Sequence, residues 1–273
     1  MIDIIGIITR TWLASHSPAP VQQVTLAPLV AAGGAGSAAA AAQPAPVAAQ
    51  PASASAVVGE VQKFYAGIKQ VTATFRQSVT NNTFGSTKTS DGTVWLMKPG
   101  RMRWDYLEKK KNVTKVKKSF ISNGSYLYVV EHDNKQVVKK NLQNDLMPVA
   151  VTFLYGKGDL QKEFNPEIDT SGKYGGKEDI VLKMTPKQPS AQYKNLYLVV
   201  AKDNYRVKQS VIVDSSNNVN QFMFYLPNFE KPVKESIFEF DERSVKNYRI
   251  VDADQQGQGS GAPAPAALPP PAK

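Results

Sequence analysis

The sequence predicts a mainly β fold in which an antiparallel meander forms one large curved sheet or barrel. Short segments such as "GTVWLMK" and "RMRWDYL" alternate apolar and polar side chains and are rich in aromatic and β-branched residues. Pairs of turn-forming residues separate these segments, among them Pro99-Gly100, Asn123-Gly124 and Asp203-Asn204. About ten sequential strands joined mainly by short hairpins indicate a meander. The expected strands span residues 72–79, 92–98, 101–107, 118–124, 125–132, 135–142, 179–186, 195–202, 206–214 and 219–226.

Two segments depart from this alternation and favour helices. The stretch "VVGEVQKFYAGIKQV" has the i, i+3, i+4, i+7 spacing of an amphipathic helix, with an apolar stripe of Val58, Val61, Phe64, Tyr65 and Ile68. Midway through the meander, "NDLMPVAVTFLYGKGDLQKEF" favours a short helix that ends near Gly156, with an apolar stripe of Leu146, Val149, Ala150, Phe153 and Leu154. We expect these helices to cover the open face of the sheet. The alternative is that they plug a small barrel as ordinary core.

Composition limits the foldable part of the 273 residues to one domain. Residues 1–56 include "AAGGAGSAAAAAQPAPVAAQPASASA", a linker composition with almost no large apolar side chain, and residues 253–273 repeat the pattern. We therefore expect an Ala/Pro-rich leader, a folded domain at 57–252 and a disordered tail. A secretory signal is expected near residue 25, the alternative being a disordered cytoplasmic extension. No apolar run approaches the roughly 20 residues that span a bilayer.

The residues that carry most enzyme chemistry are missing from the sequence or scattered through it. The chain has no cysteine and two histidines, and we expect the one in the domain, His132, to lie in an exposed loop. No HExxH, GxSxG, Walker or GxGxxG pattern occurs, and the carboxylates show no spacing typical of an acid/base pair. We therefore expect no enzyme activity, no cofactor and no metal site.

The net charge of +10 lies in the middle of the chain and favours an acidic partner. Its densest part is "KKKNVTKVKK", which contains Lys109, Lys110, Lys111, Lys115, Lys117 and Lys118. One interpretation is a solvated hairpin whose cations prevent edge-to-edge aggregation, and the other is a docking surface. A basic β-barrel that binds nucleic acid is a further alternative. It is disfavoured because the chain lacks an RRM, KH or helix-turn-helix signature and its aromatic residues alternate across the whole sheet.

The sequence resembles the LolA family, the periplasmic carriers of outer-membrane lipoproteins. The resemblance rests on "VTATFRQ", "DGTVWLMKPGRMRWDY", "ISNGSYLYVV", "MPVAVTFLYGKGDL", "LKMTPK" and "VIVDSSNNVNQFMF", which occur in unbroken order between residues 57 and 242. It implies an unclosed antiparallel β-barrel of about ten or eleven strands, covered by short α-helices that act as a lid. It also implies an apolar cavity for the acyl chains of a lipoprotein.

Alternation along the strands can supply the wall of such a cavity, while Arg101, Arg103 and Asp105 point outward. The expected lipid-cavity residues are Phe75, Val94, Leu96, Met102, Trp104, Tyr106, Leu196, Leu198, Phe222 and Phe224. The expected lid residues are Leu146, Val149, Phe153 and Leu154.

The resemblance also places a gate at Lys98. In the family a basic residue, usually arginine, precedes the proline of this turn and holds the lid closed by hydrogen bonds. Lysine lacks the forked donor set of arginine, so lid control is expected to be looser, or to rest on Arg101 or Arg76.

The partners that the resemblance implies are acylated lipoproteins as cargo, an inner-membrane ABC-type release complex and an outer-membrane lipoprotein receptor where the organism has one. We expect a periplasmic monomer. The alternative within the same fold is a related open-barrel protein that binds lipid or senses envelope stress without carrier activity.

Overall fold

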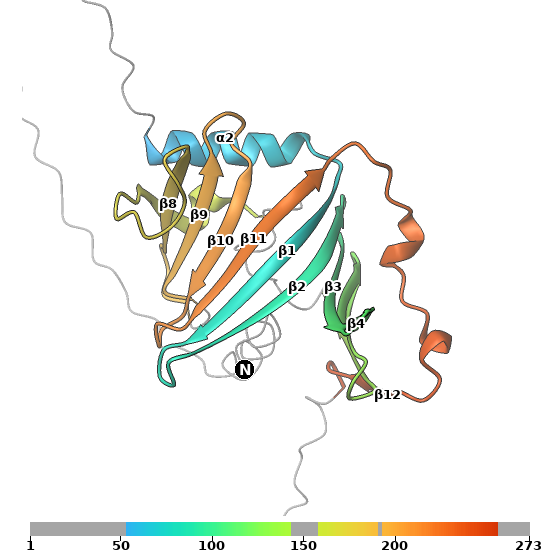
Figure 1. Ribbon diagram of the computed structural model, residues 1–273. Helices are drawn as coiled ribbons and strands as arrows, with labels where there is room; N and C mark the ends of the chain where they lie inside the picture. Colours follow the sequence, from blue (N-terminus) through green and yellow to red (C-terminus); the bar gives the residue numbers. More distant parts are fainter. Residues whose placement is uncertain (1–52, 143–157, 191–192, 256–273) are drawn as a thin grey trace, which may run out of the picture.

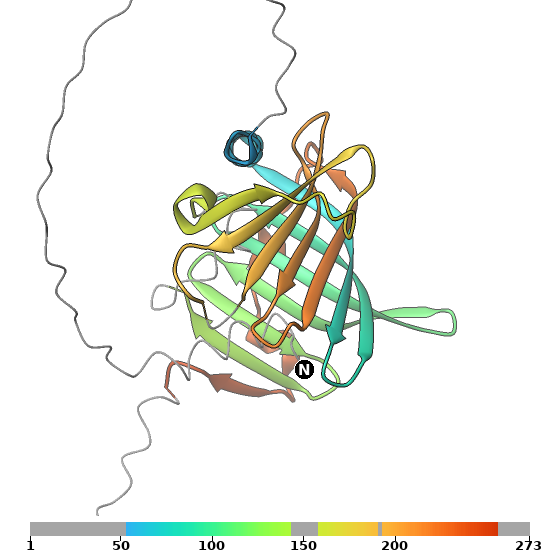
Figure 2. The same cartoon turned by 90° about the vertical axis from the view of Figure 1, so that its left-hand side faces the viewer.

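A computed structural model describes residues 53–142, 158–190 and 193–255 of the chain. Its main feature is a 12-stranded sheet with the strand order β12-β6-β5-β4-β3-β2-β1-β11-β10-β9-β8-β7. The sheet curves around an interior, and helix α2 (Ala54–Gly67) lies across one end of it (Figure 1, Figure 2). The strands are β1 (Gln70–Asn81), β2 (Ser86–Met97), β3 (Arg101–Lys110), β4 (Val113–Asn123), β5 (Tyr126–Glu131), β6 (Gln136–Asn141), β7 (Phe164–Ile168), β8 (Asp179–Pro186), β9 (Asn195–Ala201), β10 (Val207–Val213), β11 (Val219–Asn228) and β12 (Arg249–Asp252).

The pairing of β1 explains how a meander becomes one curved sheet. β1 pairs antiparallel with β2 on one side and with β11 on the other, so the two ends of the meander meet in the middle of the sheet. The other neighbours are also antiparallel, except that β12 runs parallel to β6. β12 and β7 stand at opposite ends of the strand order. The sheet is therefore unclosed, which confirms the predicted open barrel.

All ten predicted strands are present, but two further strands were not predicted. β7 contains Pro166, which cannot donate to a strand ladder, and it lies at an edge of the sheet, where proline is tolerated. β12 has four residues, too few to show alternation, and it lies just before the Gly/Pro-rich tail. Neither strand carries the periodic signal on which the other assignments depend.

The inner face of the sheet forms the main hydrophobic core. Side chains at every second position of β1, β2, β3 and β11 point inward and join the buried residues of β8, β9 and α2. Within α2 the buried residues are Val57, Val58, Val61 and Tyr65, and Phe64 packs half-buried against the core. Ile68, the residue just after the helix, also packs against the core. The predicted apolar stripe of this helix is confirmed.

Helix α2 is fixed at its N-terminal end by hydrogen bonds. Ser53 caps its N-terminus, where the Ser53 hydroxyl accepts a bond from the Ala56 amide at 3.2 Å. A single-turn helix, α4 (Leu160–Glu163), contacts α2, and the Gln161 side chain donates to the Ser55 carbonyl at 2.9 Å. The helix begins at Ala54, so the folded region starts before Val57.

The C-terminal segment, residues 229–252, covers a second hydrophobic cluster on the outer face of β3 to β6 (Figure 1). Its 3-10 helix η2 (Glu235–Phe238) lies against β3 and β4, a second 3-10 helix, η3 (Glu242–Val245), follows, and β12 pairs with β6. The cluster comprises Ile121, Tyr128, Val130, Val137 and Val245, with Tyr126, Phe240 and Tyr248 packed against it. The parts of these strands that lie beneath the segment are therefore covered on both faces.

The C-terminal segment changes the exposure that the sequence predicted for two residues, Asp105 and His132. Asp105 lies on the outer face as predicted, but it is buried and accepts hydrogen bonds from Ser119 at 2.7 Å and Arg103 at 3.0 Å. His132 was expected to be exposed, whereas it is half-buried with its Nδ1 2.9 Å from the Tyr248 hydroxyl. Burial lowers the pKa of His132. Tyr248 belongs to the C-terminal segment, and Arg103, which donates to Asp105, also donates to the Ile237 carbonyl of that segment at 3.2 Å.

A smaller cover protects the outer face of β8 to β10. The loop between β7 and β8 brings Tyr174 against Tyr197, with ring centroids 5.1 Å apart, and Gly175 against Val181 and Val199. Val199 on β9 and Val211 on β10 are fully buried there. The outer faces of β1 and β11, in the middle of the sheet, carry exposed residues such as Thr74 and Tyr225 instead.

Gly92 is required by the packing of Phe75 across the β1–β2 pair. The two residues are directly opposite one another, and a Cβ atom on Gly92 would lie 2.4 Å from the Phe75 ring and 2.3 Å from the Asp105 carbonyl oxygen. The Phe75 ring therefore occupies the space that any other side chain on residue 92 would need.

Replacing Gly92 by alanine should lower the free energy of unfolding by about 2 kcal/mol, because the new methyl group forces the Phe75 ring and the β3 backbone apart. Urea denaturation monitored by tryptophan fluorescence checks this. Gly67→Ala is the matched control, since a Cβ there meets no atom within 4 Å and alanine is the better helix residue. Equal stability of the two variants would refute the packing argument.

Candidate functional site

The structure brings the predicted lipid-cavity residues together on one surface. Nine of the ten are buried in the main core, and the tenth, Phe224, packs against it while remaining half-buried. The buried residues are Phe75, Val94, Leu96, Met102, Trp104, Tyr106, Leu196, Leu198 and Phe222. They come from β1, β2, β3, β9 and β11, so the inner wall is a continuous apolar surface that extends over most of the sheet.

Aromatic rings form the centre of this wall. The Phe75 ring lies 5.1 Å from Trp104 and 5.0 Å from Tyr106, both in edge-to-face geometry, and 6.0 Å from Phe222. Trp104 also meets Phe222 edge to face at 5.5 Å. Such ring pairs add roughly 0.5–1.5 kcal/mol each beyond the area that they bury. These ring contacts therefore help to hold β1, β3 and β11 in register, in addition to the backbone hydrogen bonds between neighbouring strands.

The wall also contains one buried polar pair. The Gln77 side-chain amide donates to the Asn220 side-chain oxygen at 2.8 Å across β1 and β11, and both residues are almost fully buried. The Asn220 amide nitrogen has no hydrogen-bond partner. Since a buried unpaired amide is costly, this pair marks the least apolar part of the wall.

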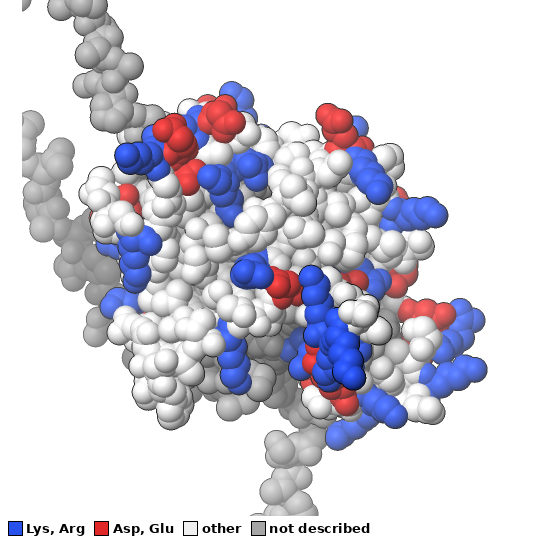
Figure 3. All heavy atoms as spheres, in the orientation of Figure 1, with Lys and Arg blue, Asp and Glu red and all other residues white. Residues whose placement is uncertain are grey.

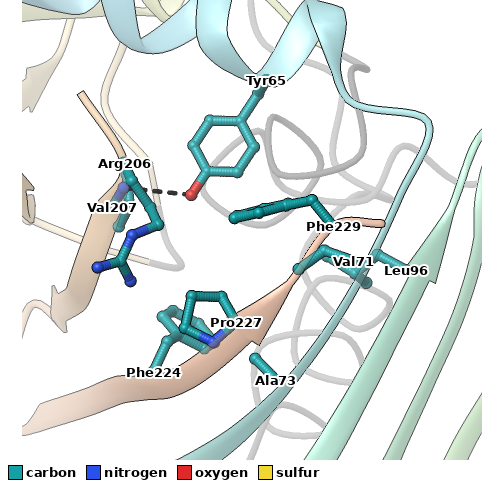
Figure 4. A pocket seen from close by; sticks show the side chains of 9 residues that line it. All are labelled: Tyr65, Val71, Ala73, Leu96, Arg206, Val207, Phe224, Pro227 and Phe229. Atoms are coloured by element: carbon teal, nitrogen blue, oxygen red, sulfur yellow. Dashed lines mark hydrogen bonds between the residues drawn. The ribbon is translucent and has the colours of Figure 1, made fainter. Parts of the chain in front are cut away.

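A pocket opens at the end of the sheet where α2 crosses it (Figure 4). Its volume is about 30 Å³, so it has space for one or two waters on the scale where a water needs about 10–15 Å³. Tyr65 enters from α2, and Arg206 lies on the opposite side from Val71 and Leu96. The lining residues are Tyr65, Val71, Ala73, Leu96, Arg206, Val207, Phe224, Pro227 and Phe229.

Tyr65 joins α2 to β10 at this pocket. Its hydroxyl accepts a hydrogen bond from the Val207 amide at 3.2 Å (Figure 4). Burial raises the pKa of Tyr65 to about 12, and the Val207 bond and the Arg206 charge oppose that rise. The phenol is therefore neutral at physiological pH and serves as a structural contact.

Lys98, the predicted gate, holds the C-terminal end of α2. Its ammonium group donates to the Tyr65 carbonyl at 2.6 Å and to the Ala66 carbonyl at 2.9 Å. These carbonyls belong to the last turn of the helix, where a cation interacts favourably with the helix dipole. Burial lowers the pKa of Lys98. The contacts of Lys98 in the described residues are thus with α2.

The two other predicted gate arginines form ion pairs elsewhere. Arg101 pairs with Glu235 of η2 at 2.9 Å, so it fixes the C-terminal segment to the outer face. Arg76 pairs with Asp91 of β2 at 2.7 Å on the exposed face. Within the described part of the chain, neither side chain points into the interior. The predicted lid residues Leu146, Val149, Phe153 and Leu154 lie outside the described residues.

The predicted docking lysines lie on a hairpin of β3 and β4 that projects from the sheet (Figure 2). Figure 3 shows cationic side chains gathered over this part of the surface. Several are already paired: Lys110 and Lys115 with Glu108, Lys117 with Asp133, and Lys118 with Glu131. Lys109 and Lys111 form no ion pair with any described residue. They are the cations most available to a partner.

Several site features could not be found in the sequence. Phe229 lines the pocket but lies beyond the predicted strand 219–226. Arg206 is the first residue of the predicted strand 206–214 but precedes β10, and no role was predicted for it. The positions of both residues depend on long-range packing, which strand alternation does not report.

Among the described residues, no group of three or more His, Asp or Glu side chains is placed to hold a metal ion. In the same residues, every helix is too short or too polar to cross a bilayer.

An unclosed sheet around a continuous apolar wall defines a class of open-barrel proteins. The family described as "Outer membrane lipoprotein carrier protein LolA" matches residues 66–241, and the chain therefore belongs to the LolA family.

Individual relatives are distant. An "Outer-membrane lipoprotein carrier protein" of Chromobacterium violaceum is 28% identical over 170 residues, which cover 62% of this chain and 76% of that protein. The carrier protein of that name from Cupriavidus pinatubonensis is 27% identical over 147 residues, or 52% of this chain and 64% of the relative, just under two thirds. The crystal structure of a LolA superfamily protein from Nitrosomonas europaea matches with a TM-score of 0.38 and 11% identity, over 69% of this chain and 98% of that one.

Replacing Lys98 by methionine should lower the free energy of unfolding by about 1 kcal/mol and speed amide exchange in the last turn of α2, because two carbonyls lose a charged donor. Urea denaturation and hydrogen exchange measure the two effects. Lys98→Arg should keep most of the stability, since arginine also donates to carbonyls. Lys63→Met, on the exposed side of the same helix, is the control and should change the free energy by less than about 0.5 kcal/mol. If amide exchange in the last turn of α2 is as slow in Lys98→Met as in the parent, the hydrogen bonds from Lys98 do not stabilise that turn.

Proposed function

We propose that the protein is a periplasmic carrier that encloses lipoprotein acyl chains within its curved sheet and ferries them from the inner to the outer membrane. The observation that carries this proposal is the continuous apolar inner wall in a chain that matches the LolA family over residues 66–241. The names of the relatives, which describe outer-membrane lipoprotein carriers, support the same cargo.

The energetics of lipid transfer explain why such a wall is needed. Each CH₂ group removed from water contributes about 0.8 kcal/mol, so two or three long acyl chains face a cost on the order of tens of kcal/mol when they leave a bilayer. A carrier must therefore provide an apolar environment of side chains in place of the bilayer. The inner wall, which includes Phe75 and Leu198, offers such a surface.

The aromatic centre of that wall is buried among other side chains. The pocket beneath α2, of about 30 Å³, is by itself far too small for a long acyl chain. We expect cargo that binds at these residues to displace side chains that pack against them, so that the empty and loaded states compete. We propose that Lys98 influences the balance between the empty and loaded states, because it fixes the helix that covers the pocket.

The partners follow from the same proposal. Acylated lipoproteins are the cargo, an inner-membrane ABC-type release complex supplies them, and an outer-membrane lipoprotein receptor accepts them where one exists. No reaction is needed at any step on the carrier, since apolar contacts alone transfer the chains.

Introducing a carboxylate at Phe224 should abolish most acyl-chain capture while leaving the protein folded. Phe224 is half-buried in the pocket wall, so a glutamate there remains hydrated in the empty state and loses water when a chain arrives. We expect at least a tenfold loss of affinity for a solvatochromic acyl probe, which corresponds to about 1.4 kcal/mol. The same variant should release less lipoprotein from inner-membrane spheroplasts.

Tyr225→Glu is the matched control for this experiment. Tyr225 is the next residue on β11, is 43% exposed and points to the opposite face, so the same charge there should leave capture unchanged. Both variants are compared at matched folded fraction. Parent-like capture by Phe224→Glu, or equal losses in the two variants, would contradict the assignment of the inner wall to lipid.

The β3–β4 hairpin supports a further part of the proposal, docking to an acidic membrane surface. Neutralising Lys109 and Lys111 together by glutamine should slow association with inner-membrane vesicles about threefold or more at low salt and flatten the salt dependence. Stopped-flow light scattering measures the rate. Lys63→Gln with Lys162→Gln removes the same charge from exposed positions on α2 and α4 and should have little effect. If both pairs slow association equally, net charge alone acts and the hairpin has no special role.

A further inference from the structure

The wall of the pocket beneath α2 contains one arginine, Arg206. Its guanidinium makes no hydrogen bond or ion pair with any described residue, although its charge acts on the nearby Tyr65 phenol and it lines an otherwise nearly apolar pocket. Its neighbours in sequence are paired: Lys208 donates to Asp179 at 2.8 Å and Lys202 donates to the Lys177 carbonyl. Unlike these two lysines, Arg206 has no hydrogen bond or ion pair from its side chain to a described residue.

Arg206 is the charged residue in this pocket wall, and the other polar side chain is already engaged. The Tyr65 hydroxyl accepts the Val207 amide hydrogen, and the remaining lining residues are apolar (Figure 4). Guanidinium groups bind carboxylates and phosphates through two parallel hydrogen bonds, and such bonds strengthen where apolar surface excludes water. The chemistry of the pocket therefore matches a ligand with an anionic head and an apolar tail.

Leu226, near the end of β11, is an exposed apolar residue with a strained backbone, and the next residue in the chain, Pro227, lines the pocket. Leu226 adopts a left-handed backbone conformation with φ of 48° and is 84% exposed, between the pocket residues Phe224 and Pro227. A bulge occurs here, since Thr72 and Thr74 pair with Asn228 and Tyr225. Leucine is unfavourable in this conformation, and strain of this kind is concentrated at binding sites. The bulge holds an exposed leucine where glycine or asparagine would be more stable.

We propose that this pocket is a binding site for a single-chain anionic amphiphile, with the carboxylate or phosphate on Arg206 and the apolar tail against Ala73, Leu96 and Phe224. The pocket takes the first part of the tail, and the exposed Leu226 rim covers more of it. This goes beyond lipoprotein carriage, because the ester- and amide-linked acyl chains of a lipoprotein carry no negative charge. Arg206 thus gives the site a preference for anionic ligands, which the capture of uncharged acyl chains does not require.

The test compares decanoate, decyl phosphate and decanol, which share one tail, on the full-length protein by isothermal titration calorimetry below their micellar concentrations. The parent protein should bind decanoate or decyl phosphate about tenfold more tightly than decanol. Arg206→Gln should remove that difference, since one charge-assisted pair contributes roughly this factor. Arg249→Gln, the same change on the distant edge strand β12, is the control and should bind as the parent does.

Two further variants separate the head from the tail. Ala73→Leu fills the pocket and should weaken all three ligands. Leu226→Asn relaxes the backbone and removes the rim, so it should weaken all three without lowering the melting temperature. Loss confined to decyl phosphate in Arg206→Gln identifies a phosphate site, and loss confined to decanoate identifies a carboxylate site.

The proposal is overturned if the parent binds decanol as tightly as the two anions, or if Arg206→Gln binds all three as the parent does. Lipoprotein carriage is tested separately, by spheroplast release with Phe224→Glu and its control Tyr225→Glu. A parent protein that releases lipoprotein but shows no preference for the anions overturns this proposal alone.

Discussion

The pairing of β1 with both β2 and β11 is the constraint on which the rest of the structure depends. It turns a sequential meander into a continuous sheet by joining strands about 150 residues apart. Phe75 stands at this junction, with Gly92 opposite it on one neighbour and Phe224 on the other. The missing side chain at Gly92 lets the ring lie across the strand and meet Trp104 and Tyr106. Backbone pairing and ring packing therefore fix the same curvature.

Much of the inner wall could be predicted from the sequence because strand alternation is a local signal. Met102, Trp104 and Tyr106 follow one another at every second position, and the turn at Pro99-Gly100 sets their register. The meander and the stripe of α2 were predictable for the same reason.

The features that were missed depend on contacts between distant segments. The burial of Asp105 depends on the C-terminal segment, which has no periodic pattern, and the partners of Lys98 are carbonyls that any sequence would offer. The pocket around Arg206 joins a turn, a helix and a bulge. Side-chain type alone does not show whether a cation has a partner. Local pattern therefore predicts the wall well and its polar details poorly.

The unequal cover on the outer face has a mechanical consequence. β3 to β6 lie under the C-terminal segment and β8 to β10 lie under the loop that carries Tyr174, whereas Thr74 and Tyr225 leave the middle strands bare. Two covered parts of the sheet thus flank β1 and β11, whose outer faces carry exposed residues. Because β1 and β11 are packed mainly on their inner faces, we expect a change in strand twist to cost less free energy there than under either cover. Such a change would alter the width of the interior while both outer layers stay in place.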